Sequence, residues 1–567
     1  MLDPNDLPNL LDVGEVDVAV RRVVDSVPLF ATKEVEKDGE TLTVFANQPP
    51  TMPALFQMMA LHAEKEAIVY LDERYTFGTV FQRACSVAHT LRDDHGIQEG
   101  DRVVIAMRNY PDWIFVYIGV LAAGGVAVLL NAWWGAEELN WALGNSGAKL
   151  VIADQRRAEL LKDGGSALPT LVARGTGTFA ALEDAYTKQV ASFPEISVTS
   201  DDDAYIMYTS GSTGLPKGAV TTHHGGVGVL MTWMAIAVAL KCMGRGNPDP
   251  DFQPVALVGV PFFHVTGLVS VMSASMLLGR KLAILHKWDV EEAMQLIEKE
   301  KVNGFSGVPT MSYELTSSPL REKYDLTSLT DVGGGGAARP QDHVQMMQKN
   351  LPHVTAPALG YGLTETNAIT AAITGQEYVD RPTSTGRPTP PLITVKIMKS
   401  ETEEAATGEV GEIWIKSSAN ARGYWQNQEA TERAFVGAWF RSGDIGKLDG
   451  DGYLYIVDRM KEIIIRGGEN ISPLEVEAVL HGIDGVEDVC VFGLPDEKMG
   501  EIVGCLLSIP ADDLRPTDVL AAAAPSLAKF KLPEKIWITN DPLPRIGTGK
   551  VDRKGISDEY RAIVAAA

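Results

Sequence analysis

The sequence predicts an α/β and α+β protein. We expect a large N-terminal domain of parallel or mixed sheets covered by helices, with a β subdomain, and then a small C-terminal α+β domain. Three observations predict this fold. At 567 residues the chain is too long for a single hydrophobic core. Helical and strand patterns alternate over residues 54–180 and again over 254–360, and shorter β elements take over after about residue 385.

The alternating regions contain recognisable elements. Residues 56–71 and 75–96 look helical over much of their length. Short runs rich in β-branched residues and bounded by turn residues predict strands at 101–107, 125–131 and 148–154, and then at 256–260, 281–285, 303–309 and 330–336. Parallel sheets with helical crossovers follow from this alternation.

The last third of the chain predicts a β subdomain and a separate tail. Strands are expected at 394–398, 411–416 and 452–458, the last after a tight turn at 449–452. A boundary follows at 458–461, which divides the chain into residues 1–460 and 461–567. The tail opens with a strand, a Gly-Gly loop and a helix, for which Ser472 is the N-cap, Pro473 the first residue and Glu475 the partner in a capping box.

Composition narrows the class of protein. A hydrophobic content of 45% and a charged content of 22% are ordinary for a soluble globular protein, and a net charge of −24 argues against nucleic-acid binding. Four scattered cysteines and an acidic, Pro-containing start predict a cytoplasmic protein without a secretory signal. The apolar runs 113–135 and 260–279 are interrupted by Gly, Asn, Pro or His, so we expect buried elements and no transmembrane segment.

The stretch YTSGSTGLPKGAV, residues 208–220, has the composition of a phosphate-binding loop. Its glycines let backbone N–H groups approach a ligand, its hydroxyls add donors, and Lys217 adds a positive charge. It is not a Walker loop, because Pro216 precedes the lysine and Gly218 follows it. The alternative is a flexible surface loop, which most Gly/Ser stretches are.

This stretch resembles the signature loop of the adenylate-forming superfamily, which includes acyl-CoA synthetases, firefly luciferase and the adenylation domains of nonribosomal peptide synthesis. The resemblance covers roughly residues 55–560. It implies ATP- and Mg²⁺-dependent activation of a carboxylic acid to acyl-AMP with release of pyrophosphate. It also implies that the loop holds the β- and γ-phosphates through Thr209, Ser210, Gly211, Ser212, Thr213, Gly214 and Lys217.

Further motifs of that superfamily follow in order. GYGLTET, residues 360–366, resembles its nucleotide motif, which implies that Tyr361 flanks the adenine, Thr364 meets the α-phosphate and Glu365 binds Mg²⁺. The flanking Gly360 and Gly362 belong to the same motif. The strip at 333–340, with Gly335, Gly336 and Ala337, resembles the segment between the adenine and acyl sites.

Other members of the site are implied by the later motifs. Asp444 in WFRSGDIG is expected to take the ribose hydroxyls, a natural role for a two-oxygen acceptor. Arg459 is expected to reach the ribose or phosphate, with Ile456 against the base. Lys550 in LPRIGTGKVDRK matches the catalytic lysine, whose ammonium would bridge the substrate carboxylate and the α-phosphate.

The acceptor of the acyl group is predicted to be CoA. PFFHVTG, residues 261–267, resembles the aromatic-His segment of acyl- and aryl-CoA synthetases, with His264 as a gate, and lacks the Asp that amino-acid adenylation domains place there. Lys461 matches the hinge on which the tail turns, and Gly467 and Gly468 match the loop that lines the pantetheine tunnel. Relatives that load a carrier-protein thiol typically carry an extra insertion that obstructs this turn of the tail. No such insertion is evident between residues 385 and 461, which favours CoA as the acceptor.

The motifs define the carboxylic acid substrate less closely than the acceptor. The apolar helix expected at 227–240, with Met231, Trp233 and Met234, and the small residues Thr266 and Ser270 suit a medium-length apolar chain. An aryl acid, a carrier-protein acceptor and a non-enzymatic nucleotide-binding scaffold remain as alternatives. A homodimer is also left open.

Overall fold

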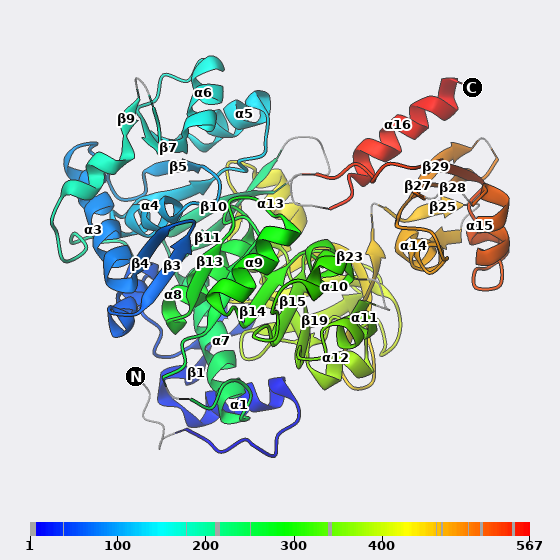
Figure 1. Ribbon diagram of the computed structural model, residues 1–567, viewed down its shortest axis with the longest axis horizontal. Helices are drawn as coiled ribbons and strands as arrows, with labels where there is room; N and C mark the ends of the chain where they lie inside the picture. The colour runs from blue at the N-terminus through cyan, green and yellow to red at the C-terminus, as the bar shows by residue number, and fades with distance from the viewer. Residues whose placement is uncertain are drawn as a thin grey trace.

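The computed structural model describes residues 7–37, 39–176, 179–209, 216–249, 251–337, 339, 343–460, 462–466, 469–496, 498–510, 514–546 and 550–566. Figure 1 shows a large body, blue to yellow, and a smaller C-terminal lobe, orange to red, at its side. The short 3₁₀ turns are η2 (Pro28–Phe30), η3 (Gln57–His62), η4 (Leu182–Thr187), η6 (Pro319–Glu322), η7 (Thr364–Thr366) and η8 (Lys529–Lys531).

One large sheet of the body is mostly parallel and has the strand order β21-β11-β10-β6-β5-β7-β8-β9. Its strands are β5 (Arg102–Ala106), β6 (Val126–Leu129), β7 (Leu150–Asp154), β8 (Thr170–Ala173), β9 (Ala180–Ala181), β10 (Asp203–Thr209), β11 (Lys217–Thr222) and β21 (Gly423–Tyr424). Its helices include α3 (Phe77–Asp93), α4 (Pro111–Ala122), α5 (Ala136–Ser146) and α6 (Gln155–Asp163). Strands β6 and β7 are buried along their whole length, as their continuous apolar runs predicted.

A second large sheet has the order β18-β17-β16-β15-β14-β12-β13-β3-β4. Its strands are β3 (Glu66–Tyr70), β4 (Glu73–Thr76), β12 (Val255–Val258), β13 (Lys281–Ile284), β14 (Gly304–Gly307), β15 (Asp331–Gly335), β16 (Ala356–Tyr361), β17 (Ala371–Thr374) and β18 (Arg387–Pro388). Helices α8 (Ala274–Leu278), α9 (Val290–Glu300), α10 (Pro309–Ser317), α11 (His343–Asn350) and α12 (Gln376–Asp380) belong to this part of the body.

The helix expected over 56–71 is wrong for its second half. The chain is helical only through α2 (Met52–Phe56) and η3, and then forms β3. Ala67, Ile68 and Val69 are fully buried there, between β13, which runs parallel to β3, and the antiparallel β4. Burial of a β-branched run on both faces of a sheet outweighs the helical periodicity of the preceding residues.

The predicted β subdomain is an antiparallel sheet with the order β19-β20-β23-β22, and a further strand, β24, pairs with β23. The bounds are β19 (Ile393–Met398), β20 (Gly411–Ser417), β22 (Phe435–Val436), β23 (Trp439–Leu448) and β24 (Leu454–Arg459), with α13 (Gln428–Ala434) before β22. The N–H of Gly452 donates to the carbonyl of Asp449 at 3.1 Å, which closes the turn expected between β23 and β24.

The C-terminal lobe has its own sheet, in the order β26-β25-β28-β27, with β29 parallel to β28. Its elements are β25 (Ile464–Arg466), β26 (Glu469–Ile471), α14 (Pro473–His481), β27 (Asp488–Asp496), β28 (Gly500–Ser508), α15 (Pro516–Ala523), β29 (Lys535–Thr539) and α16 (Arg553–Ala566). Ser472 caps α14 by accepting from the N–H of Glu475 at 3.1 Å. The capping box is incomplete, because the Glu475 carboxylate bonds the ammonium of Lys531.

The N-terminal segment lies against a long central helix. It contains α1 (Val16–Ser26) and the hairpin of β1 (Thr32–Lys37) and β2 (Glu40–Phe45), and α1 packs on α7 (His223–Cys242). Within the described residues, α7 alone is long and apolar enough to cross a membrane by length and composition. Core helices of soluble proteins pass the same test, and most of α7 is buried inside the protein.

Candidate active site

Thr209 and Lys217 stand at the facing ends of two strands. They are paired in the antiparallel register of β10 and β11, and the Thr209 hydroxyl donates to the Lys217 carbonyl at 3.3 Å. Lys217 is therefore fixed at its backbone by the sheet. The predicted phosphate-loop residues between them lie outside the described residues: Ser210, Gly211, Ser212, Thr213 and Gly214.

The nucleotide motif at 360–366 joins the end of β16 to η7. Gly360 and Tyr361 are the last residues of the strand, and Thr364 begins the 3₁₀ turn. Gly362 lies so close to the returning chain that an added Cβ would stand 2.4 Å from the carbonyl carbon of Ala368. The tight fold of this loop therefore requires glycine at position 362.

Glu365 is buried at the centre of this loop. The Tyr424 hydroxyl donates to its Oε1 at 2.6 Å, and the N–H of Ala421 donates to its backbone carbonyl at 2.8 Å. Burial raises the pKa of Glu365, and the hydrogen bond from Tyr424 opposes that rise. The ammonium of Lys217 lies 5.3 Å from the centroid of the Tyr424 ring. Tyr424 thus links the carboxylate to the lysine of β11.

This carboxylate fits a magnesium ion in a nucleotide site. Mg²⁺ in such sites takes one or two protein carboxylates, and substrate phosphates and water complete its coordination. Tyr424 occupies one oxygen of Glu365 and fixes the orientation of the carboxylate. In the part of the chain that the structure describes, no group of three or more His, Cys, Asp or Glu residues could hold a metal ion by itself.

Asp444, Arg459 and Tyr361 form a second polar group. Asp444 and Arg459 are opposite each other in β23 and β24, and the Arg459 Nε lies 3.0 Å from the Asp444 Oδ1. The Tyr361 hydroxyl donates to the Asp444 Oδ2 at 2.6 Å. Burial raises the pKa of Asp444, and the Arg459 guanidinium opposes that rise. Ile456, paired with Gly446 in the same strands, lies half-buried nearby in the fold.

Lys550 of the C-terminal lobe reaches this part of the body. Gly335 ends β15, and Gly336 and Ala337 follow it on the exposed strip. Gly336 has a φ of +77°, and an added Cβ there would stand 3.8 Å from the Lys550 Nζ. The structure therefore brings the lysine to the glycine strip.

Burial and the charged groups around Lys550 shift its pKa. Burial and then the Arg459 guanidinium lower its pKa to about 8, while Asp444 and Glu462 act in the opposite direction. The ammonium stands within electrostatic reach of the polar group formed by Asp444 and Arg459. One lysine of the small lobe thus joins a cluster whose other members come from the end of β15, from β23 and from β24.

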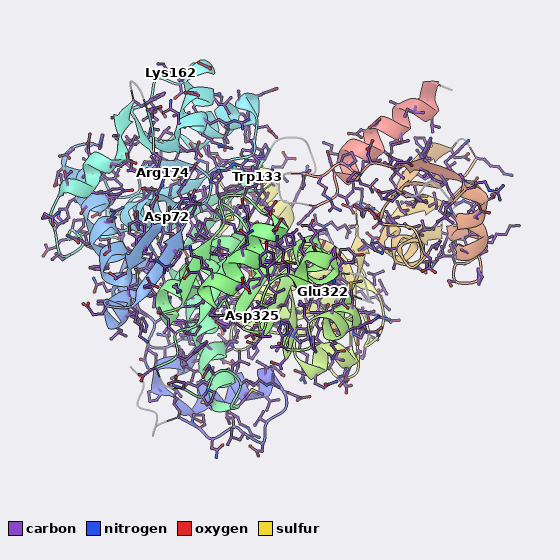
Figure 2. All side chains as sticks on the ribbon, viewed as in Figure 1. Asp72, Trp133, Lys162, Arg174, Glu322 and Asp325 are labelled. Carbon is purple, nitrogen blue, oxygen red and sulfur yellow. The ribbon has the colours of Figure 1, made fainter. Side chains whose placement is uncertain are left out.

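His264 lies within electrostatic reach of Lys550 and next to aromatic rings. Its ring centroid is 4.8 Å from that of Phe263 and 5.9 Å from that of Trp133, and its buried Nε2 has no hydrogen-bond partner among the described residues. Burial and then the charge of Lys550 lower the pKa of His264 to about 3. The imidazole of His264 is therefore neutral at pH 7. Figure 2 shows Trp133 on the side of the body that faces the C-terminal lobe.

The expected acyl-pocket residues occupy two contacting helices. Met231 and Met234 are buried in α7, and Trp233 is partly buried. Thr266 and Ser270 lie in η5 (Thr266–Ser273), a π-helix that follows His264 and contacts α7. π-Helical turns occur frequently at functional sites. The expected pocket residues thus begin two positions after the histidine.

Two functional candidates have no signal in the sequence motifs, and three predicted residues join the five of the phosphate loop outside the described residues. Tyr424 and Trp133 carry no motif of their own, and only the fold brings them to Glu365 and His264. In the sequence, the only signal for Tyr424 is that it directly follows an Ala-Arg-Gly run in the region of the matched motifs. Lys461, Gly467 and Gly468 lie outside the described residues.

The acidity of Lys550 predicts the pH dependence of acid activation. The resemblance implies that the Lys550 ammonium offsets two approaching anions; on that expectation, kcat/KM for acid-dependent pyrophosphate release should fall above about pH 8, by about tenfold per pH unit. The pH profile of pyrophosphate release measures this. Lys550→Arg should be slower but should lose the alkaline limb, since a guanidinium stays protonated. An unchanged limb in that variant would assign the titration to another group.

Comparison with known proteins places this cluster in context. The sequence model of AMP-binding enzymes matches residues 55–425, and that of the AMP-binding enzyme C-terminal domain matches residues 475–550. The chain is 34% identical to a feruloyl-CoA synthase of Amycolatopsis sp., over 84% of this chain and 92% of that protein. It is 32% identical to a long-chain-fatty-acid–CoA ligase of Mycobacterium tuberculosis, over 83% and 90% of the two chains.

A solved structure shares the fold over nearly the whole chain. The o-succinylbenzoate CoA synthetase of Bacillus subtilis, in complex with its acyl-adenylate intermediate, superposes with a TM-score of 0.75 at 25% identity. The match covers 90% of this chain and 98% of that one. The likeness thus extends over both the body and the C-terminal lobe.

Proposed function

The chain belongs to the family of AMP-binding enzymes and is an AMP-forming acid–CoA ligase, and from that premise we propose its substrate and the roles of its residues. It uses ATP to activate a carboxylic acid as acyl-AMP and then transfers the acyl group to CoA. We propose that the acid is hydrophobic and of medium length. Met231 and Met234, in a helix that contacts the π-helix beside His264, support an apolar pocket.

The observation that carries the proposed site is the position of Lys550. Its Nζ lies against the glycine strip, close enough to Asp444 and Arg459 for their charges to shift its pKa. We propose that Lys550 neutralises the repulsion between the acid's carboxylate and the α-phosphate as they approach each other. A preformed ammonium at this point stabilises charge that is concentrated only during the reaction.

The neighbouring groups suit the other parts of ATP. We propose that Tyr361 and Ile456 flank the adenine and that Asp444 accepts from the ribose hydroxyls, with Arg459 beside it. Thr209 and Lys217, with the residues between them, would hold the β- and γ-phosphates, and Thr364 the α-phosphate. Glu365 would hold Mg²⁺, which supplies charge neutralisation of the phosphates when bound.

We propose that the chain divides into residues 1–460 and 461–567, with Lys461 as the pivot. One orientation of the tail presents Lys550 for adenylation, and the other presents Gly467 and Gly468 to the pantetheine arm, with His264 at the entrance. The separate sheet of the C-terminal lobe supports a rigid unit that turns as a whole. We further propose a cytoplasmic location. Whether the enzyme forms a homodimer is left open.

The pivot makes a distinct prediction. Lys461→Pro should lower the rate of thioester formation by about tenfold or more while adenylation changes by less than about threefold, because proline fixes φ and hinders the turn. Stopped-flow assays of the two half-reactions measure this. Lys461→Ala keeps the backbone free and should leave both rates close to wild type.

A panel of acids tests the substrate proposal. AMP formation is followed with CoA, Mg·ATP and linear acids from butanoate to palmitate, alongside benzoate, cinnamate and ferulate. We expect the highest kcat/KM near octanoate. A preference for cinnamate or ferulate would show an aryl-CoA ligase instead, in line with the feruloyl-CoA synthase relative. Acyl transfer to a pantetheinylated carrier protein but not to CoA would overturn the acceptor.

A further inference from the structure

The two stretches of chain on either side of residues 547–549, which lie outside the described residues, are bonded to each other. The N–H of Ile546 donates to the carbonyl of Lys550 at 2.9 Å, and the N–H of Asp552 donates to the carbonyl of Pro544 at 2.8 Å. Arg545 and Val551 form an isolated β-bridge between the same two stretches. The backbone position of Lys550 is therefore set by the residues that anchor these stretches.

Arg553 provides the strongest of these anchors. It is the first residue of α16 and lies three positions after Lys550. Its two terminal nitrogens lie 2.6 and 2.9 Å from the two oxygens of Glu477 in α14, and one of them also donates to the carbonyl of Val491 in β27 at 2.5 Å. A two-point fork of this kind fixes direction as well as distance.

The partner of this fork is itself held in place. The N–H of Val491 donates to Glu477 Oε1 at 2.7 Å, and the Glu477 side chain is only 15% exposed. The remaining nitrogen of the guanidinium, Nε, lies 3.1 Å from Glu462 Oε2. Glu462 also acts electrostatically on Lys550, raising its pKa. Arg553 thus connects helix α14, strand β27 and the start of the lobe to the segment that carries the lysine.

We propose that Arg553 is a positioning residue for acid activation, which acts through Lys550 by holding the 550–553 segment in register with Glu477 and Glu462. This rests on the proposed role of Lys550. Arg553 makes its contacts inside the C-terminal lobe, so they should persist when the lobe turns. Its loss should therefore weaken the step that needs Lys550 and spare the step that does not.

The test uses the full-length enzyme, with the panel acid that the wild type activates fastest. Arg553→Lys keeps the charge but removes the fork, and Glu477→Gln weakens the same contact from the other side. A displacement of about 1 Å in a reacting group costs on the order of 10²-fold. We therefore expect about a 30- to 100-fold lower kcat for pyrophosphate release in each variant, with KM for ATP within about threefold. Thioester formation from supplied acyl-AMP should stay within about twofold.

Arg515 offers a matched control and Lys550 an epistasis test. Arg515 also forms a two-point pair with one carboxylate of its lobe, Asp518, but at the exposed start of α15. Arg515→Lys should change neither half-reaction. In a Lys550→Ala background, Arg553→Lys should add less than about twofold to the loss in residual pyrophosphate release, because both changes act through one group.

The outcomes separate this inference from the proposed function. Equal loss of both half-reactions, a full additional loss in the Lys550→Ala background, or wild-type adenylation in Arg553→Lys would each overturn the role of Arg553. A wild-type enzyme that releases no pyrophosphate with any acid of the panel would count instead against the proposed function. Urea midpoints of all variants identify any loss that comes from unfolding.

Discussion

Lys550→Ala should lower acid-dependent pyrophosphate release by at least about 10²-fold and leave thioester formation from supplied acyl-AMP nearly unchanged. The reason lies in the position of the ammonium, against Gly336 and within the electrostatic reach of Asp444 and Arg459. Removal of one preorganised group that stabilises developing charge typically costs about 10²- to 10³-fold. Separate assays of the two half-reactions, with pyrophosphate and acyl-CoA as the readouts, measure the effect.

A second lysine variant tests the specificity of this loss. Lys554→Ala removes a neighbouring, exposed lysine of α16 and should leave both half-reactions as they are. Equal losses of the two half-reactions in Lys550→Ala would contradict the account in which the lobe presents different groups at different steps. Normal pyrophosphate release in that variant would remove Lys550 from the site altogether.

Gly362→Ala should lower adenylation by about 10²-fold and destabilise the fold by about 3 kcal/mol. An added Cβ would lie 2.4 Å from the Ala368 carbonyl carbon and 2.7 Å from the Ile369 nitrogen, and backbone atoms cannot move aside as a flexible side chain can. The loop between them carries Thr364 and Glu365, so relief of the overlap must displace both residues. Pyrophosphate release and urea unfolding report the two effects.

Gly144→Ala is the control for the added methyl group. Gly144 lies in α5, and an added Cβ meets nothing within 4 Å. This substitution should stabilise the protein by up to about 1 kcal/mol, because alanine favours a helix over glycine. Adenylation should not change. Wild-type rates in Gly362→Ala would show that the loop tolerates displacement and that Glu365 is not held as we describe.

The fold followed largely from hydrophobic patterning. Strands such as β6 and β7 are buried on both faces, so their apolar runs identify them without tertiary information. β3 was missed because its neighbour β13 lies more than two hundred residues away in the chain, and local periodicity does not report such a pairing. The same limit explains the incomplete capping box of α14. The Glu475 side chain bonds the distant Lys531 and not the backbone N–H of the N-cap residue Ser472.

The candidate site divides in the same way. Asp444, Arg459 and Lys550 stand in motifs that resemble those of the adenylate-forming superfamily, so the resemblance predicts them one by one. Their partners do not: Tyr424 bonds Glu365 only because the two-residue strand β21 adds to the edge of β11. The proposed preference for one acid is harder still to predict, because on our proposal it depends on how α7 and the π-helix pack against each other and not on any single residue type.

The closeness of Lys550 to His264 has a consequence for the timing of the chemistry. Burial weakens the basicity of the imidazole, and the lysine's charge weakens it further. If the lobe carries this charge away after the first step, the histidine becomes a better proton acceptor just as a thiol would arrive. Rotation of the C-terminal lobe would then also raise the basicity of His264 in the body. The imidazole would become more basic only after the acyl group has been activated.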